Sequence, residues 1–207
     1  MDTAPQQPKQ TSGALRIFMI ICGVIVLLGG MATAWKGVQK FRTRNTPEFK
    51  RAVEDSDNAI KDAVRYAGEA TPLFQQMLKD VDSKGLADFR SHQKEAATKT
   101  NELLGEAAES FRRGKAKLEE AQPLNRKEQL APYLAVKARS YGLRAEAIEI
   151  NQEIVGFILD DSMTSIDALV PKLSEAAARR DEIAKNADAA DKEANEIGQR
   201  IQGPAKK

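Results

Sequence analysis

The feature that most constrains this chain is an uncharged apolar stretch of eighteen residues, 17–34, which reads IFMIICGVIVLLGGMATA. Arg16 precedes the stretch, and Trp35 and Lys36 follow it. Eighteen helical residues span roughly 27 Å, which is close to the thickness of the hydrocarbon core of a bilayer. The stretch therefore predicts a single transmembrane helix over residues 14–36, with the rest of the chain attached to it.

The same stretch has a second interpretation, a secretory signal peptide that is removed from the mature protein. Its last three residues, Ala32-Thr33-Ala34, match the small-residue pattern of a cleavage site. Lys36 and Lys40 lie just beyond this site and disfavour cleavage and export. A permanent anchor is therefore the first expectation, and the cleaved form is the alternative.

Basic residues are more frequent after the apolar stretch than before it, and residues 37–45 form a basic juxtamembrane linker. Because positively charged flanks stay in the cytoplasm, this asymmetry favours a single-pass protein of the cell membrane whose following domain faces the cytoplasm. An exported domain is the alternative. The charges on the C-terminal side of the stretch are Lys36, Lys40, Arg42, Arg44, Lys50 and Arg51.

The remainder of the chain is not basic. Residues 1–45 contain six basic residues and one acidic residue, whereas residues 46–207 contain 26 basic and 29 acidic residues. The sequence pI of about 8.6 therefore comes from the flanks of the apolar stretch. A nucleic-acid-binding domain would need the opposite distribution, so we expect no nucleic-acid partner.

Residues 46–202 predict an all-α domain, a long antiparallel four-helix bundle with coiled-coil-like seams. Along the first helix, apolar or small residues recur at alternating spacings of four and three, which is a heptad pattern. Turn-forming residues near Gly85, Pro123 and Asp160 divide the domain into helices at about 46–82, 86–122, 126–159 and 163–201. Short connections favour antiparallel neighbours. Residues 1–13 and 203–207 are expected to be disordered tails.

The sequence contains no recognisable catalytic, cofactor-binding or metal-binding motif. His92 is the only histidine, and the chain has neither a Glu-x-x-His pair for a di-iron centre nor a Cys-x-x-Cys-His haem motif. A glycine-rich phosphate loop is also missing. We therefore expect a protein that is not an enzyme and has no cofactor, with His92 on the surface of the second helix.

Four polar residues fall on or next to the apolar stripes of the third and fourth helices: Lys137, Arg144, Asn151 and Arg180. They allow three interpretations. Buried polar groups can fix the register of a bundle, or they can line a ligand pocket. Long side chains at the edge of a seam can also extend to water, and this interpretation is the favoured one.

Antiparallel helices would bring several basic clusters to the membrane end of the bundle. Such an end would sit on anionic lipid headgroups, with each nearby charge contributing about 1 kcal/mol. The predicted membrane-surface contacts are Lys36, Lys40, Arg42, Arg44, Arg112, Arg113, Lys115, Lys117, Arg126 and Lys127.

Together these patterns predict a membrane-anchored helical bundle that acts as a structural or protein-interaction module. Its partners would be the lipid bilayer and either an unidentified protein or a second copy of the chain. The alternative is an exported ligand-binding or sensory bundle, anchored or released by cleavage.

Overall fold

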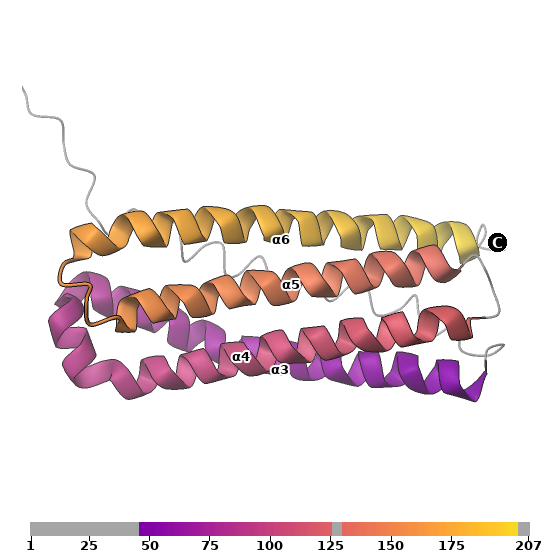
Figure 1. Ribbon diagram of the computed structural model, residues 1–207, viewed down its shortest axis with the longest axis horizontal. Helices are drawn as coiled ribbons and strands as arrows, with labels where there is room; N and C mark the ends of the chain where they lie inside the picture. The colour runs from indigo at the N-terminus through magenta and orange to yellow at the C-terminus, as the bar shows by residue number, and fades with distance from the viewer. Residues whose placement is uncertain (1–45, 126–129, 203–207) are drawn as a thin grey trace, which may run out of the picture.

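The computed structural model describes residues 46–125 and 130–202, in which all regular structure is α-helical (Figure 1). The helices are α3 (Pro47–Lys84), α4 (Leu86–Leu124), α5 (Leu130–Leu159) and α6 (Ile166–Gln202). They alternate in direction and lie side by side in an elongated bundle (Figure 1). At about 1.5 Å per residue, the 38 residues of α3 extend roughly 57 Å. The predicted all-α four-helix bundle is confirmed.

The predicted transmembrane helix over residues 14–36 lies outside the described residues. Within residues 46–125 and 130–202, none of the helices is both long enough and apolar enough to cross a bilayer. The membrane span, the basic linker at 37–45 and the two tails at 1–13 and 203–207 therefore stay predictions.

The first helix begins and ends where the local chemistry requires. The Thr46 hydroxyl accepts a hydrogen bond of 3.2 Å from the backbone N–H of Phe49, which caps the helix, and Pro47 occupies its first position. The helix continues through Pro72. Gly85 alone separates α3 from α4, and its φ of 83° favours glycine because other residues rarely adopt a positive φ.

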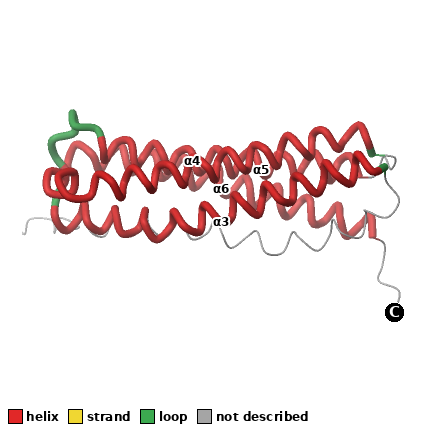
Figure 2. Tube along the Cα trace, turned by 90° about the horizontal axis from the view of Figure 1, so that it is seen from below, coloured by secondary structure: helices red, strands yellow, loops and turns green. Residues whose placement is uncertain are grey.

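The connection between α5 and α6 is longer than expected (Figure 2). Helix α6 begins at Ile166, three residues after the predicted start at Met163. The reason is local: the Asp160 carboxylate accepts a hydrogen bond of 2.9 Å from the N–H of Ser162, which forms a turn instead of a helix. Ser165 then caps α6, since its hydroxyl accepts a hydrogen bond of 3.2 Å from the N–H of Ala168.

Arg90 on α4 fixes this connection from across the bundle. Its guanidinium donates hydrogen bonds of 2.8 Å to the carbonyl of Ile158, 2.7 Å to that of Asp160 and 2.6 Å to that of Met163. The last four carbonyls of a helix have no partner within the helix, and Ile158 supplies one of them. One side chain of α4 thus caps the end of α5 and orders the start of the connection.

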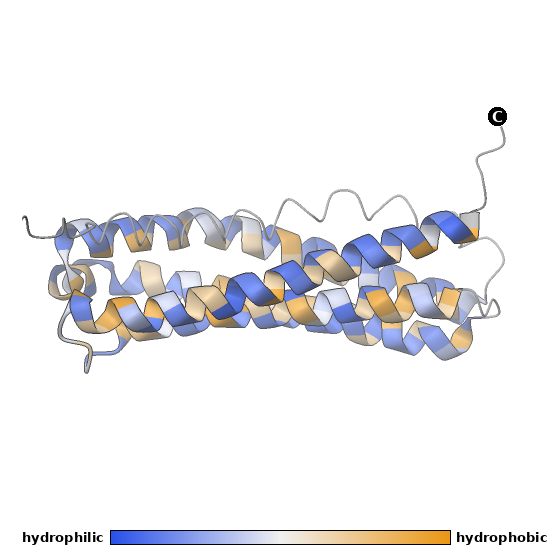
Figure 3. Ribbon diagram, turned by 90° about the horizontal axis from the view of Figure 1, so that it is seen from above, coloured by the Kyte–Doolittle hydropathy of each residue, from blue (hydrophilic) through white to orange (hydrophobic). Residues whose placement is uncertain are grey.

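The apolar core consists of two main clusters, one toward each end of the rod. Helix α4 packs closely along both α3 and α5, and α5 along α6, whereas close backbone approaches between α3 and α6 are sparse. Apolar residues recur along the helices between hydrophilic ones (Figure 3). The larger cluster includes Phe74, Leu78, Phe89, Phe111, Ile154 and Leu173, and the smaller one includes Phe49, Val53, Leu118, Leu130 and Leu134.

The burial of α4 and α5 departs in places from a strict seven-residue apolar repeat. Ala96 is exposed while its neighbour Ala97 is buried, and Leu143 is only half-buried. On α5 the fully buried line passes through Ser140, Arg144 and Ala147 instead. A straight helix has 3.6 residues per turn, so an inward stripe drifts from a strict seven-residue repeat.

Candidate functional site

The predicted membrane-surface contacts divide into two groups. Lys36, Lys40, Arg42, Arg44, Arg126 and Lys127 lie outside the described residues. The other four lie on α4, seven to twelve residues before its end at Leu124. At about 1.5 Å per residue they are roughly 10–18 Å from that end. They therefore lie on the side of the rod rather than on its end face. These four are Arg112, Arg113, Lys115 and Lys117.

Three of these four cations already contact carboxylates. Arg112 pairs with Glu149 of α5. Lys115 lies 3.4 Å from a carboxylate oxygen of Glu119, and Lys117 donates a hydrogen bond of 2.7 Å to Glu120. Arg113 instead donates to the hydroxyl of Ser110, at 2.8 Å. These pairs reduce the local excess of positive charge that the sequence alone suggests, and the lipid contact itself stays a prediction.

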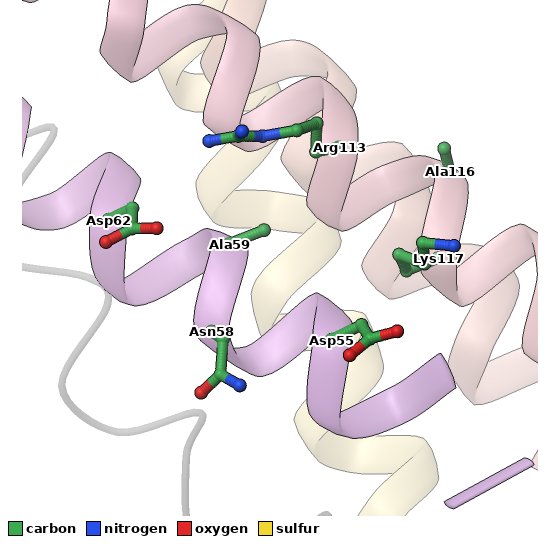
Figure 4. A pocket seen from close by; sticks show the side chains of 7 residues that line it. All are labelled: Asp55, Asn58, Ala59, Asp62, Arg113, Ala116 and Lys117. Carbon is green, nitrogen blue, oxygen red and sulfur yellow. The ribbon is translucent and has the colours of Figure 1, made fainter. Parts of the chain in front are cut away.

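Arg113 and Lys117 also line a cavity of about 340 Å³ between α3 and α4 (Figure 4). The α3 side of this cavity carries Asp55, Asn58 and Asp62, so acidic and basic groups face each other across it. Ala59 and Ala116 complete the lining. The charges are mixed, and the cavity has no single sign that would select an anion or a cation.

The four polar residues predicted on α5 and α6 are buried. The exposed fractions of Lys137, Arg144, Asn151 and Arg180 are 2%, 1%, 2% and 0%. The favoured interpretation, that these side chains extend from the edge of a seam to water, is therefore wrong. They lie inside the interface between α5 and α6, where an ion or polar group without a partner is costly.

On α5 these residues belong to one column with a spacing of seven. The exposed fraction is 7% or less at every position of this column, which consists of Leu130, Lys137, Arg144, Asn151 and Ile158. The two ends of the column are apolar and its three central positions are polar. A heptad column faces the same neighbouring helix along its whole length, so the polar positions of α5 all meet α6.

Asp191 of α6 is the centre of the resulting charge cluster. One of its carboxylate oxygens accepts a hydrogen bond of 2.7 Å from the Lys137 ammonium, and the other accepts one of 2.7 Å from the Arg144 guanidinium. Arg144 also donates to Asp188, at 3.0 Å. Two cations of α5 are thus paired with two carboxylates spaced three residues apart on α6.

A second polar contact lies further along the same interface. Arg180 donates hydrogen bonds of 2.9 and 2.7 Å to its neighbour Asp181, and its third nitrogen lies 3.4 Å from the side-chain oxygen of Asn151. At the rim, exposed pairs join Arg139 to Glu193 and Arg179 to Glu153. The interface between α5 and α6 is therefore held by polar contacts from its core to its rim.

The charge cluster separates the two apolar clusters of the core. On α5, Lys137 lies next to Ala138 of the smaller cluster, and Arg144 lies next to Ala145 of the larger one. At the corresponding point of the other pair of helices, the buried Ser56 hydroxyl of α3 donates a hydrogen bond of 2.8 Å to the carbonyl of Gly114 on α4. A polar layer thus crosses all four helices, and its buried ion pairs join α5 to α6.

The burial of this layer changes the pKa values of its members. Burial alone would raise the pKa of Asp191, but the charge of Lys137 and the hydrogen bond from Arg144 outweigh it and lower that pKa. Burial raises the pKa of the Tyr133 hydroxyl, and the nearby charges of Asp57 and Asp191 act in the same direction. The carboxylate of Asp191 therefore stays ionised and Tyr133 stays neutral near pH 7. Burial lowers the pKa of Lys137, and the charge and hydrogen bond of Asp191 oppose that shift.

Sequence reasoning found the cations of this cluster but missed the anions. Ala187, Ala190 and Ala194 recur at helical spacing along α6, and all three are fully buried. Asp191 and Asp188 lie three residues apart, and each directly follows one of these buried alanines. This position next to small inward residues was the sequence signal that could have identified the two acids. Two acids on an inward stripe of α6 and two bases on an inward stripe of α5 would have suggested pairing.

The described residues include no group of three or more histidine, cysteine or acidic side chains placed to hold a metal ion. The prediction for His92 is confirmed, because its side chain is 70% exposed and lies beside Asp88. Comparison of the chain with models of protein families, with curated proteins and with solved structures finds no match. The buried charge cluster and the cavity between α3 and α4 are thus the candidate sites.

Proposed function

We propose that this protein is a membrane-anchored helical bundle that works as a structural or protein-interaction module. The observation that carries the proposal is the combination of an apolar stretch at residues 17–34 with four long helices packed into one rod. Helix α3 begins at Pro47, thirteen residues after the stretch ends at Ala34, so the rod would project from the membrane on a short basic linker.

The buried charge cluster supports a structural role rather than a chemical one. Lys137 and Arg144 are engaged by Asp191 and Asp188, and Arg180 by Asp181. Buried polar pairs are best known for fixing which helices pair and in which register. A module with a defined shape benefits from such pairs, because its surface must present the same residues to a partner each time.

Binding of the rod to anionic lipid belongs to the same proposal. Lys50 and Arg51 lie in the first turn of α3, nearest to the expected anchor. Arg112, Arg113, Lys115 and Lys117 lie on the side of the rod, so their contact with lipid requires the rod to tilt toward the membrane. Vesicles with anionic lipid test this part: binding of the chain should weaken as salt rises, since salt shortens the range of charge interactions.

The anchor is tested by washing isolated membranes with high salt and with carbonate. The full chain should stay in the membrane fraction, because an apolar span does not depend on charge for its attachment. Val26→Arg should move a large fraction of the chain to the soluble fraction, since an arginine at the centre of a span costs about 2.5–3.5 kcal/mol on insertion scales. Val26→Leu is the matched control, and release of the unaltered chain by carbonate would contradict the proposal.

The cavity between α3 and α4 is the observation that favours the second candidate function, an exported ligand-binding or sensory bundle. Its lining of Asp55, Asp62, Arg113 and Lys117 offers both charge signs to a small polar ligand. Sequencing the N-terminus of the mature protein tests the version of this second function in which the signal peptide is cleaved. A chain that begins after Ala34 supports the exported form, and an intact N-terminus supports the anchor.

A further inference from the structure

Helix α6 contributes less large apolar surface to the core than any other helix of the bundle. Its fully buried large apolar residues are Leu169 and Leu173, both in its first turns. From Ala176 to Ala194 every buried apolar residue of α6 is alanine. Apolar stabilisation scales with the area removed from water, and an alanine side chain removes little. In the rest of the helix the alanines are joined by Ile183, Ile197 and Ile201, which are only partly buried against the core, so the apolar contact of α6 is smaller than that of the other helices.

Polar contacts with α5 take the place of that apolar contact. Asp191 meets Lys137 and Arg144 inside the interface, and Asp188, whose side chain is 40% exposed, meets Arg144 at its edge. At the rim, Glu193 meets Arg139. Buried ion pairs contribute more to the choice of partner than to net stability, because the cost of removing both charges from water offsets their attraction. The ion pairs thus specify where α6 packs, but they add little to the free energy that keeps it there.

The link between α5 and α6 is held by a single residue of another helix. The six residues from Asp160 to Ser165 form it, and the three hydrogen bonds from Arg90 fix its beginning. Loss of these bonds would free the carbonyls of Ile158, Asp160 and Met163. The link is then long enough for α6 to separate from α5 while α4 keeps its contacts with α3 and α5.

We propose that α6 is a releasable helix, and that the face of α5 beneath it is a docking surface for the α6 helix of a second copy of this chain. Release uncovers two cations, Lys137 and Arg144, in a column that runs from Leu130 to Ile158 and also contains the polar Asn151. The inference rests on the proposed function, because it names the partner of the interaction module.

The chemistry of the uncovered face selects α6 over an unrelated helix. Two cations spaced seven residues apart require carboxylates at the same level along the axis of the docking helix. Asp188 and Asp191 supply them. The close approach also requires small residues, which α6 provides as Ala184, Ala187 and Ala190. Every copy carries this helix, and exchange of an identical element between copies recreates the same contacts. Copies anchored in one membrane would meet at raised effective concentration.

The first test is hydrogen exchange of the full-length chain in detergent micelles. Backbone amides of α6 between Ala176 and Ala194 should exchange at least about tenfold faster than those at the centres of α4 and α5, because local opening exposes them without global unfolding. Asp191→Asn should increase this difference, while the exposed Glu182→Gln should not. Exchange of α6 in step with α4 and α5 would overturn the proposal.

The second test adds a labelled peptide of residues 166–202 to the full-length chain. It should bind saturably, and binding should increase when the receiving chain carries Arg90→Ala, which removes the hydrogen bonds to the α5–α6 connection. A peptide with Asp188→Asn and Asp191→Asn should lose at least about tenfold in affinity, since it cannot neutralise the two buried cations. A Glu182→Gln peptide is the matched control.

Each outcome of the peptide test is decisive. No binding of the unaltered peptide to either chain would overturn the docking surface. Equal binding of the unaltered and double-Asn peptides would show that the charge cluster does not select the helix, and would overturn the proposal as well. Neither result bears on the anchor, which carbonate extraction tests independently. The two proposals can therefore fail separately.

Discussion

The pair α3–α4 and the pair α5–α6 are both antiparallel and are held together in different ways. Between α3 and α4 the buried contacts are large and apolar, with Phe74 and Leu78 on one side and Phe89 on the other. Between α5 and α6 the middle of the interface consists of ion pairs and alanines. Large apolar residues give stability with little directional preference, whereas charges give direction with little stability. The α3–α4 pair therefore contributes most to the stability of the bundle, and the α5–α6 pair contributes most to the specificity of helix pairing.

The largest expected effect comes from removing an apolar residue of the first pair. Phe74→Ala should destabilise the bundle by about 3–5 kcal/mol, because the site is 1% exposed and its neighbours cannot collapse fully into the space left. Chemical denaturation followed by circular dichroism measures this. The exposed Leu73→Ala is the control and should cost much less. Equal losses for both variants would show that the apolar packing of α3–α4 is not what stabilises the pair.

Breaking the charge cluster on one side should have a smaller but still large effect. Arg144→Met should cost about 3 kcal/mol, because Asp188 loses its cation and Asp191 keeps only Lys137. The comparison that sharpens the result is a variant in which Lys137, Arg144 and Asp191 all become apolar. That variant should regain most of the stability and lose the preference for one register. A triple variant as unstable as the single one would show that the ion pairs stabilise α5–α6 outright.

A third prediction concerns how closely α3 approaches α4. A Cβ at Gly114 would lie 2.6 Å from Cδ1 of Ile60, so Gly114→Ala should cost about 1–3 kcal/mol through overpacking. Gly156→Ala on α5, where an added Cβ meets nothing, is the matched control and should be neutral or stabilising. Ile60→Val should partly rescue Gly114→Ala. Thermal melting tests this contact in the unaltered chain, in the two glycine variants and in the variant that combines Gly114→Ala with Ile60→Val. Equal melting temperatures for Gly114→Ala with and without Ile60→Val would contradict the contact.

Acid should affect the second pair before the first. The pKa of Asp191 is lowered in the folded state, so its contribution to stability is present above the ordinary carboxyl range near pH 4 and is lost as the pH falls through and below that range. Hydrogen exchange at pH 6 and at pH 3, corrected for intrinsic rates, should show extra opening in α6 and little change in α3. If acid increased opening equally in α6 and α3, the acid sensitivity would belong to the whole bundle and the prediction would be wrong.

The smallest effect is expected from the exposed ion pairs of α4. Glu119→Gln removes the partner of Lys115, and both side chains are largely in water, at 51% and 42% exposed. Such pairs typically contribute about 0.2–1 kcal/mol. The melting temperature should therefore change little. A loss similar to that of Arg144→Met would mean that exposed and buried pairs contribute alike, and would remove the distinction between the two kinds of interface.

Much of this architecture follows from local rules that a sequence states directly. Thr46, Pro47 and Gly85 mark helix ends through capping and backbone preference, which depend on a few neighbouring residues. The heptad spacing of apolar residues identifies the inward face of α3, and short connections require neighbouring helices to be antiparallel. These rules act over one or two turns, so the sequence by itself determined four helices and their alternating directions.

The tertiary structure decided which inward residues meet. A heptad pattern states that Lys137 and Arg144 face a neighbour, but the identity of that neighbour depends on the relative height of two helices joined by a six-residue link. That height places Asp191 between the two cations. The relative position of α4 and α5 likewise sets Arg112 against Glu149 on the side of the rod. The stripes of α5 and α6 indicate which charged residues are candidates, but the partner of each depends on this relative height. For this reason only the packed bundle showed which charges meet.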